Sequence, residues 1–407
     1  MADLIGFIAI ILVCLVTLLI AARWPDVLKI IYAALAFRIF IMLIGHYLIN
    51  LPDSTHDAVG FEWGAWNMAQ NGFINNLNNF PGMNMYFYQW VIAIPYSIFG
   101  RSILMMQSIG LLFGVGSVLL GWLIAKRLWG DRVAMKVGWM LALFPTLALY
   151  SILPLREVYA SFFLLVAIFG IINWIKDDSY KSLSLAIFGF IGGTFFHGGI
   201  IFGFFVFLIF VFLNSLKKIS KLLLVNRTSP KNLLIIISTL IFLILYFSNM
   251  IYIPKLGFFK DLTDISRLRL EVGGRLIGDA SYPEWLNIEA PIEIFYKSFA
   301  RVIFFLFSPF PWDVTKPIHW IGVFDSFLYM FLIYLIFSNR KVIWKDPALR
   351  LVFIILVIYF FIFSFGVSNF GAGTRHRTKF VIEMIILAGP FIPKFIFSKK
   401  KLRKYLR

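Results

Sequence analysis

Four side chains suited to proton transfer or cation binding stand close together early in the chain. Asp53, His56, Asp57 and Glu62 fall within ten residues that contain no lysine or arginine. A carboxylate in such a loop can serve as the general base for a hydroxyl group, or can bind a divalent cation. Ser54 and Asp57 also have the spacing of a capping box, in which the acid would only help to start a helix. The spacing alone leaves both roles open.

A second group of reactive side chains is positively charged and lies near the C-terminus. Arg375, Arg377 and Lys379 place three cations within five residues, in the segment Gly371–Lys379 between two apolar runs. Arginine binds phosphate and pyrophosphate by paired hydrogen bonds, and lysine binds them as a point charge. We therefore expect this segment, as a short outward loop, to hold a phosphate. The alternative is that its cations only anchor helix ends to lipid headgroups.

Arg156, Glu157 and His197 are further polar residues beside or within apolar runs. An arginine at the position of Arg156 is a natural ligand for a lipid phosphate. Together with Glu157 it also fits a plain charge pair at the membrane surface. His197 stands among glycines, either as a buried and hydrogen-bonded histidine or as a residue that lines a cavity.

Arg38 falls near the middle of an apolar run. An ionisable residue at such a place indicates a polar cavity or an ion pair. Asp325 and Glu383 are the acids within apolar runs that fit as its partner, and the sequence favours neither.

The elements that must position these residues are apolar helices. Of 407 residues, 60% are hydrophobic and only 14% are charged, whereas a typical soluble domain has about 25% charged residues. Apolar runs long enough to cross about 30 Å of hydrocarbon recur from end to end, which predicts an all-α, polytopic transmembrane helical bundle of about 11 spans. We expect residues 1–407 to form a single integral membrane domain. The single cysteine, Cys14, excludes disulfides within the chain and cysteine metal sites.

Most of the predicted spans are apolar runs of ordinary length. Leu183–Leu213 is too long for one helix and is interrupted by glycines around His197, so we expect two shorter helices that meet there. Met83–Gly100 is rich in tyrosine and contains Pro95, and it either crosses the membrane or lies in the interface. The remaining spans are predicted at about 4–22, 28–50, 102–125, 133–153, 158–175, 233–253, 318–338, 351–370 and 380–397.

The net charge is +18, and the positions of the basic residues decide whether residues 83–100 cross the membrane or lie in the interface. If residues 83–100 lie in the interface, the basic segments all share one face with Arg23 and Lys29, as the positive-inside rule requires. These segments are 126–136, 176–181, 217–231, 340–350 and 394–407. Because the positive-inside rule accounts for the net positive charge, that charge does not indicate nucleic-acid binding. We therefore predict an outer N-terminus, outward loops with interfacial helices at 51–101 and 254–317, and a basic cytoplasmic tail at 398–407.

A motif in the first loop resembles a known family of membrane enzymes. Asp57-Ala-x-x-Phe61, followed by Ala65, Met68-Ala69 and Gly72, stands directly after a predicted span. It resembles the first outward loop of the GT-C superfamily of glycosyltransferases, which includes the protein mannosyltransferases and the aminoarabinose transferases of lipid A. Phe61 replaces the tyrosine that is usual there. The resemblance continues through Phe80-Pro81 to Ile98-Phe99-Gly100 and covers about residues 30–175.

The resemblance implies a transferase that takes a sugar from a polyprenyl phosphate or pyrophosphate. It would work at the extracytoplasmic face of a membrane, which we expect to be the bacterial inner membrane, on a glycan, lipid or protein acceptor. Asp57 would then be the catalytic base, with Asp53 as its substitute and Glu157 as a second acid. Gly371–Lys379 resembles the Arg-Tyr-Arg run of the family, with His376 in place of the tyrosine.

Under this interpretation, we expect the remaining polar residues to bind the substrate. Phosphate contacts are expected from the four cations, and contacts to other parts of the substrate from the other three residues. The set is Arg156, Arg375, Arg377, Lys379, His56, Glu62 and His197. No cofactor is implied, apart from a divalent cation that the acidic loop would suit.

Two other functions fit the same sequence. An O-antigen-type polysaccharide polymerase also uses a polyprenyl-pyrophosphate glycan, and the spacing of Arg267 and Gly278 resembles one described in such enzymes. A transporter or flippase of lipid-linked glycans would instead use Arg38 and His197 within its spans.

Overall fold

The computed structural model describes residues 1–223, 230–253, 257, 280–288, 290, 292–317 and 319–393. This part of the chain is a bundle of helices, and its only β contacts are isolated bridges. The predicted all-α class is confirmed. The tail 398–407 and the segment with Arg267 and Gly278 lie outside the described residues.

The bundle is built from long helices with shorter ones between them. The long helices are α1 (Ala2–Ala21), α2 (Leu28–Tyr47), α6 (Ile103–Trp129), α9 (Glu157–Asp177), α10 (Tyr180–Phe196), α11 (Ile201–Leu223), α12 (Pro230–Phe247), α15 (His319–Ser338) and α17 (Pro347–Phe365). The shorter helices are α3 (Asp57–Ala69), α4 (Phe73–Asn78), α5 (Phe87–Phe99), α7 (Asp131–Leu143), α8 (Pro145–Tyr150), α14 (Glu293–Phe307), α16 (Arg340–Lys345), α18 (Phe370–Arg377) and α19 (Val381–Ala388).

Seven helical segments of the described chain are long and apolar enough to cross a membrane. They are Ala2–Ala21, Pro25–Tyr47, Ile103–Trp129, Glu157–Asp177, Gly198–Ser220, His319–Ser338 and Pro347–Phe365. Shorter apolar helices include α5 and α10. The protein is therefore a multi-pass membrane protein, and the predicted number of about 11 spans stays a prediction.

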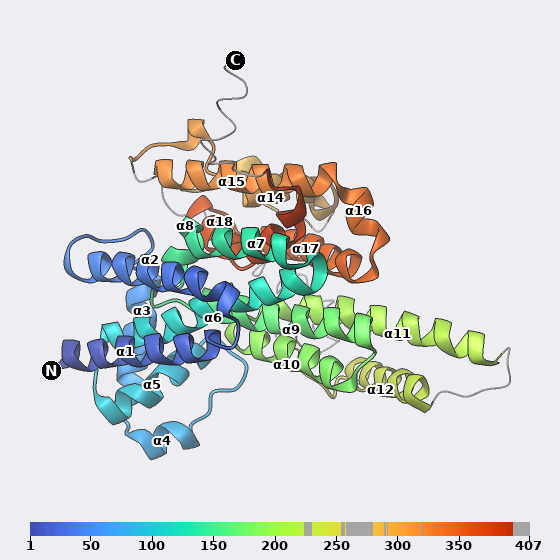
Figure 1. Cartoon of the computed structure of the whole chain (residues 1–407), viewed down its shortest axis with the longest axis horizontal. Coiled ribbons are helices and arrows are strands. Elements are labelled where there is room, and N and C mark those ends of the chain that lie inside the picture. The colour runs from blue at the N-terminus through green and yellow to red at the C-terminus, as the bar shows by residue number, and fades with distance from the viewer. Residues whose placement is uncertain are drawn as a thin grey trace.

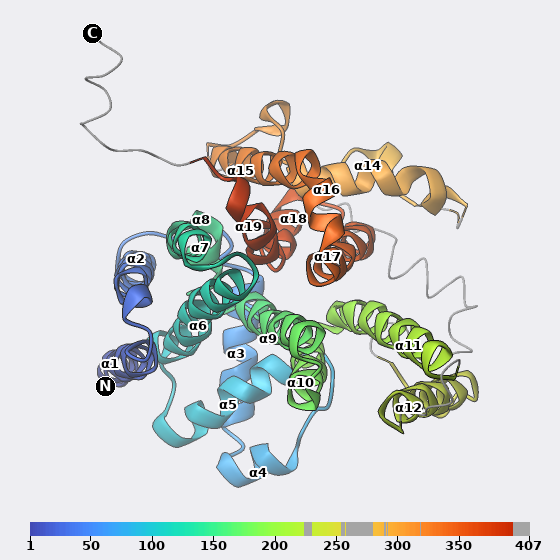
Figure 2. The same ribbon diagram turned by 45° about the vertical axis from the view of Figure 1, so that its right-hand side comes forward.

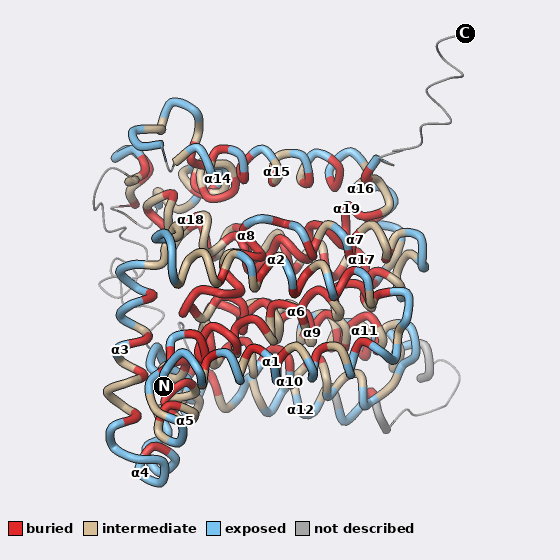
Figure 3. The backbone as a smooth tube through the Cα atoms, turned by 60° about the vertical axis from the view of Figure 1, so that its left-hand side comes forward, coloured by how far each residue is buried: buried red, intermediate tan, exposed pale blue. Residues whose placement is uncertain are grey.

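The long helices lie side by side, and their ends gather at two opposite end faces of the bundle (Figure 1). Seen in Figure 2, α6 and α9 occupy the centre, with α1 and α2 on one side, α11 and α12 on the other, and α14 to α19 above them. Figure 3 shows α3, α4, α5 and α18 at one of the two end faces, which we call the loop end. The opposite face, which we call the basic end, carries the connections around 130, 178 and 339.

Residues 83–100 contribute α5, a helix of 13 residues. At 1.5 Å per residue it is about 20 Å long, which is less than the hydrocarbon core. The chain leaves α2 and enters α6 at the same end of the bundle (Figure 3). The basic segments at 126–136, 176–181 and 340–350 therefore gather at the basic end, as the charge pattern predicts.

Cysteine labelling tests this arrangement. In a Cys14→Ser background, we expect single cysteines at Asn71 and Lys316 to react with a membrane-impermeant reagent from one side only. Cysteines at Gly130 and Lys341 should react only from the other side, because all four positions are exposed and lie at opposite ends of the bundle. Labelling of Gly130 from the same side as Asn71 would contradict the arrangement.

The stretch around His197 forms two helices, as predicted. α10 ends at Phe196, and α11 begins at Ile201 after a short 3-10 turn. α10 packs closely on α9 because Gly170 and Gly189 have no side chains. A Cβ atom on Gly170 would lie 2.4 Å from the backbone nitrogen of Ala186, and one on Gly189 would lie 2.3 Å from that of Ala167. Small residues allow this close approach of two backbones in a membrane.

The predicted span 133–153 is broken into α7 and α8 at Pro145, which has no N–H to continue the helix. Arg38 of α2 fills the break. It donates hydrogen bonds to the carbonyl oxygens of Ala142 at 2.7 Å and Leu141 at 3.1 Å, and to the Ser151 hydroxyl at 3.1 Å. Arg38 thus caps the carbonyl end of α7, where a positive charge is favourable.

Of the two alternatives for Arg38, the polar cavity is confirmed, because Arg38 lines a small cavity with several hydroxyl side chains, and the ion pair with Asp325 or Glu383 is wrong. Asp325 pairs with Arg377 instead, at 2.8 Å. The two carboxylate oxygens of Glu383 have no hydrogen-bond partner among the described residues. Arg38 has no need of an acid because the break at Pro145 provides backbone acceptors.

Two more buried arginines cap helix ends in the same way. Arg301 of α14 donates to the carbonyl oxygens of the last two residues of α17, Ser364 and Phe365, and to that of Val367 just beyond it. Arg377 of α18 donates to the carbonyls that end α14. Unpaired carbonyls are costly away from water, so each arginine stabilises a helix end inside the bundle.

Candidate functional site

Asp57 and Arg375 form an ion pair at the loop end although they lie 318 residues apart in the sequence. Nη1 of Arg375 is 2.5 Å from Oδ2 of Asp57. Asp57 is the first residue of α3, and Arg375 belongs to α18. The Asp57 side chain is 59% exposed and that of Arg375 only 17% exposed, so the acid stands at the solvent edge with the cation behind it.

Glu157, the first residue of α9, lies behind Arg375 and is buried. Its Oε1 atom is 3.2 Å from Nζ of Lys379 and 3.5 Å from Nε of Arg375. Its Oε2 atom has no hydrogen-bond partner in the described part of the chain. Glu157 thus shares its charge between two cations that come from the C-terminal part of the chain.

Lys379 also contacts a histidine. Its Nζ atom lies 2.6 Å from Nδ1 of His376, and its side chain is fully buried. Burial lowers the pKa of Lys379 to about 7, although the Glu157 carboxylate acts in the opposite direction. Burial and the Lys379 charge hold the pKa of His376 well below its usual value, so His376 is neutral and accepts a hydrogen bond from Lys379.

The turn before α3 is strained. Asp53 and His56 have φ angles of 57° and 49°, a region that non-glycine residues rarely adopt. Tyr150 of α8 donates a hydrogen bond to the Asp53 carboxylate, and burial raises the pKa of that carboxyl group. Strain of this kind costs of order 1–3 kcal/mol per residue and collects at functional sites.

The capping-box prediction for this turn is wrong. His56, not Ser54, is the N-cap of α3, and no side chain caps the helix. α3 ends at Ala69, and Gly72 is the N-cap of the next helix. Because Asp57 does not cap α3 with its side chain, its carboxylate is available for the contact with Arg375.

Arg156 is a cation of this cluster without an acidic partner in the described residues. Its guanidinium lies over the Phe61 ring, 5.5 Å from the ring centre, and makes no hydrogen bond there. Burial lowers the pKa of Arg156, and the nearby Glu157 opposes that shift. An uncommitted guanidinium beside an ion pair is suited to receive an anion.

The segment 371–379 is mostly a helix, α18, and not the predicted loop. Its three cations therefore separate. Arg375 and Lys379 join the cluster with Asp57 and Glu157. Arg377 is fully buried on another side of α18, between Asp325 and the carbonyls of α14.

The other predicted site residues lie at the margin of the cluster or outside it. Glu62 binds Arg101 at 2.6 Å and also accepts a hydrogen bond from Tyr96. His56 is exposed and contacts Thr55. The ring of His197 lies 5.2 Å from that of His376, so it borders the cluster. The structure thus brings together Asp53, Asp57, Arg156, Glu157, Arg375 and Lys379.

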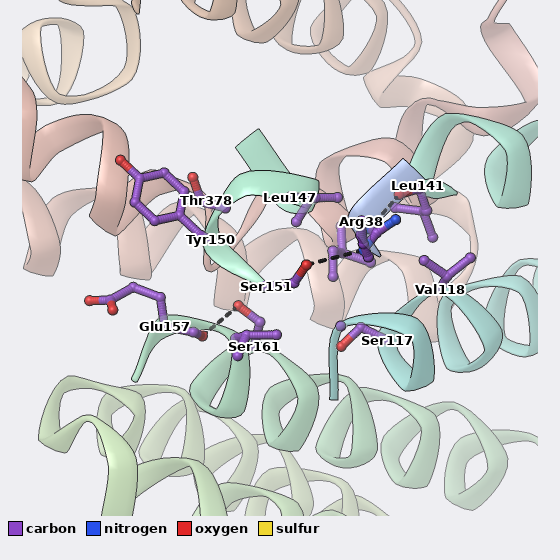
Figure 4. A pocket seen from close by; sticks show the side chains of 13 residues that line it. Arg38, Ser117, Val118, Leu141, Leu147, Tyr150, Ser151, Glu157, Ser161 and Thr378 are labelled. Atoms are coloured by element: carbon purple, nitrogen blue, oxygen red, sulfur yellow. Dashed lines mark hydrogen bonds between the residues drawn. The ribbon is translucent and has the colours of Figure 1, made fainter. Parts of the chain in front are cut away.

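A small cavity extends from Glu157 into the bundle towards Arg38 (Figure 4). Hydroxyl groups of Tyr150, Ser161 and Thr378 are among its lining. It leaves about 20 Å³ for the centres of water molecules, which is room for about one of them. These lining residues fall within or beside apolar runs, where single serines and threonines gave no signal in the sequence.

The cluster combines an exposed carboxylate with cations held at fixed positions, so it can accept a proton and bind an anion. The described residues contain no group of three or more histidine, cysteine or acidic side chains placed to hold a metal ion. Comparisons with family models, with curated proteins and with solved structures find no match to this chain.

Proposed function

We propose that this protein is a membrane glycosyltransferase that moves a sugar from a polyprenyl phosphate or pyrophosphate to an acceptor hydroxyl. The observation that carries the proposal is the contact between Asp57 and Arg375. An acid suited to activate a hydroxyl and a cation suited to bind phosphate lie side by side, from the two segments with resemblance to GT-C enzymes.

Arg156 and Arg375 are the phosphate ligands in this proposal. Arg156 is the N-cap of α9, and Arg375 lies in the short helix α18. Both residues are at the loop end, where the bundle would meet the lipid headgroups. A polyprenyl chain stays in the hydrocarbon while its phosphate reaches these guanidinium groups. Arg377 is left out because Asp325 and backbone carbonyls already occupy it.

In the reaction, Asp57 takes the proton of the acceptor hydroxyl. The hydroxyl oxygen forms a bond to the anomeric carbon of the sugar, and the bond from that carbon to the phosphate oxygen breaks. The lipid phosphate leaves with the electron pair, and its charge is stabilised by Arg156 and Arg375. Glu157 and Lys379 keep Arg375 in position.

The positive-inside rule supports an extracytoplasmic site. The basic end would face the cytoplasm, so the loop end with Asp57 and Arg375 would face outward. A bacterial inner membrane supplies polyprenyl donors at that face. The acceptor is a glycan, a lipid or a protein with an accessible hydroxyl group.

Substitution of the proposed phosphate ligands tests the function. We expect Arg375→Ala and Arg156→Ala to lower the transfer rate at limiting donor about 10- to 100-fold, because a hydrogen bond to a charged group contributes about 1.5–3 kcal/mol. Lysine at either position should restore activity only in part, since it lacks the planar pair of donors. Transfer is measured in membranes supplied with polyprenyl-linked sugars.

Arg101→Ala is the matched control, because Arg101 is also an arginine of the loop end that pairs with an acid. Per amount of folded protein it should transfer sugar at nearly the wild-type rate, although loss of the partner of the buried Glu62 carboxylate lowers its stability. Equal activity of Arg375→Ala and Arg101→Ala would remove Arg375 from the donor site.

A further inference from the structure

Arg375 is shared between two acids that differ in exposure to solvent. Its Nε atom faces Glu157, which is 3% exposed and fixed at the start of α9. Its Nη1 atom contacts Asp57, which is 59% exposed at the edge of the cluster. Burial acts to lower the pKa of Arg375, but Glu157 and Asp57 outweigh it and raise the pKa, so the cation stays charged.

A phosphate that binds Arg375 must use the edge of the guanidinium that Asp57 occupies. A bidentate contact needs two neighbouring N–H donors. The Nε atom makes no hydrogen bond to the described residues, but it is buried 3.5 Å from the Glu157 carboxylate, whose negative charge would repel a phosphate on that side. The two Nη atoms remain, and Nη1 already donates one hydrogen bond to Asp57. A phosphate bound to both Nη atoms would lie beside the Asp57 carboxylate, and the two negative charges would repel each other, so each anion weakens the binding of the other.

We propose that the donor phosphate and Asp57 compete for Arg375, so that donor binding releases Asp57 to act on the acceptor. The inference rests on the proposed function and adds the order in which the donor and the acceptor engage the site. Asp57 is the acid that leaves, because it is exposed and its side chain can turn, whereas Glu157 is enclosed. Arg156, which has no acidic partner in the described part of the chain, receives the phosphate first.

The order has a consequence for the acceptor. While the donor is absent, the carboxylate of Asp57 is held by Arg375. Once the phosphate takes Arg375, the carboxylate is free to accept the proton of a hydroxyl group. The donor therefore binds before the acceptor is activated.

Binding measurements on the full-length protein in detergent test the competition. The probe is farnesyl monophosphate, a short prenyl phosphate, with farnesol and inorganic phosphate as separate arms. We expect Asp57→Asn to bind farnesyl phosphate about two- to fivefold more tightly than wild type, because an exposed ion pair that competes for Arg375 is removed. The gain should disappear in an Arg375→Ala background. Inorganic phosphate should show the same pattern and farnesol none.

Asp131→Asn is the control, since Asp131 forms an ion pair of similar exposure with Lys126 at the basic end. It should leave the affinity unchanged. If wild type and variants bind farnesyl phosphate without any dependence on Arg375, the proposed function itself fails. If binding depends on Arg375 but Asp57→Asn does not tighten it, only the competition is overturned. A gain that persists in the Arg375→Ala background, or that appears with farnesol, also overturns it.

Discussion

Asp57→Asn is expected to lower sugar transfer by about 10²–10⁴-fold, which is the usual contribution of a general base. Asparagine has the same shape but cannot take up the proton. The variant should insert and fold as wild type does, because no side chain caps α3. The lost ion pair is largely exposed, and such pairs contribute only about 0–1 kcal/mol.

The measurement compares product formation with the amount of folded protein in the membrane. Asp53→Asn should have a smaller effect, because Asp53 is held by Tyr150 and stands farther from the exposed edge. Asp131→Asn, at the opposite end of the bundle, controls for the loss of an acid as such. A wild-type product level in Asp57→Asn would end its assignment as the base.

Arg377→Ala is expected to lower the free energy of unfolding by about 3–5 kcal/mol, the usual effect of removing one partner of a buried ion pair. Its guanidinium is enclosed, binds Asp325 at 2.8 Å, and donates to the carbonyls of Leu306 and Ser308 at 2.9 and 2.6 Å. Removal leaves a buried carboxylate and two carbonyls without these donors. Arg375→Ala, two residues away, should lose less stability, because Glu157 keeps Lys379 as its partner and Asp57 is exposed to solvent.

Thermal unfolding of the detergent-solubilised protein distinguishes these two variants. The double variant Arg377→Ala with Asp325→Ala should lose less stability than the sum of the single ones, because no unpaired charge remains. If Arg377→Ala keeps the wild-type unfolding temperature but transfers no sugar, Arg377 would belong to the donor site after all.

Much of the fold follows from local patterns. Run length and hydrophobicity predicted membrane helices, because a span needs about 20 apolar residues whatever it packs against. The glycines around His197 predicted the junction of α10 and α11. The positions of lysine and arginine predicted which connections share an end of the bundle. Each of these inferences depends only on residues close together in the sequence and on whether lipid or water surrounds them.

The members of the candidate site were also largely visible in the sequence, as charged residues between apolar runs. Their partners were not. Arg38 was expected to line a polar cavity or to pair with an acid, and the sequence did not show that the break at Pro145 would give it backbone carbonyls as partners. Arg301 was not singled out at all, since a cation in the long segment 254–317 needs no explanation until its burial is known.

The division of roles within residues 371–379 shows what the tertiary structure decided. As a loop, this segment would have offered all its cations to one ligand. As the helix α18, it turns by about 100° per residue, so Arg375 and Arg377 point to different sides. One side meets Asp57 and the other meets Asp325, from parts of the chain far apart in sequence. The sequence determined which charged residues lie near the membrane surface. Only the packing of distant helices decided which of them form buried ion pairs and which remain accessible to a substrate.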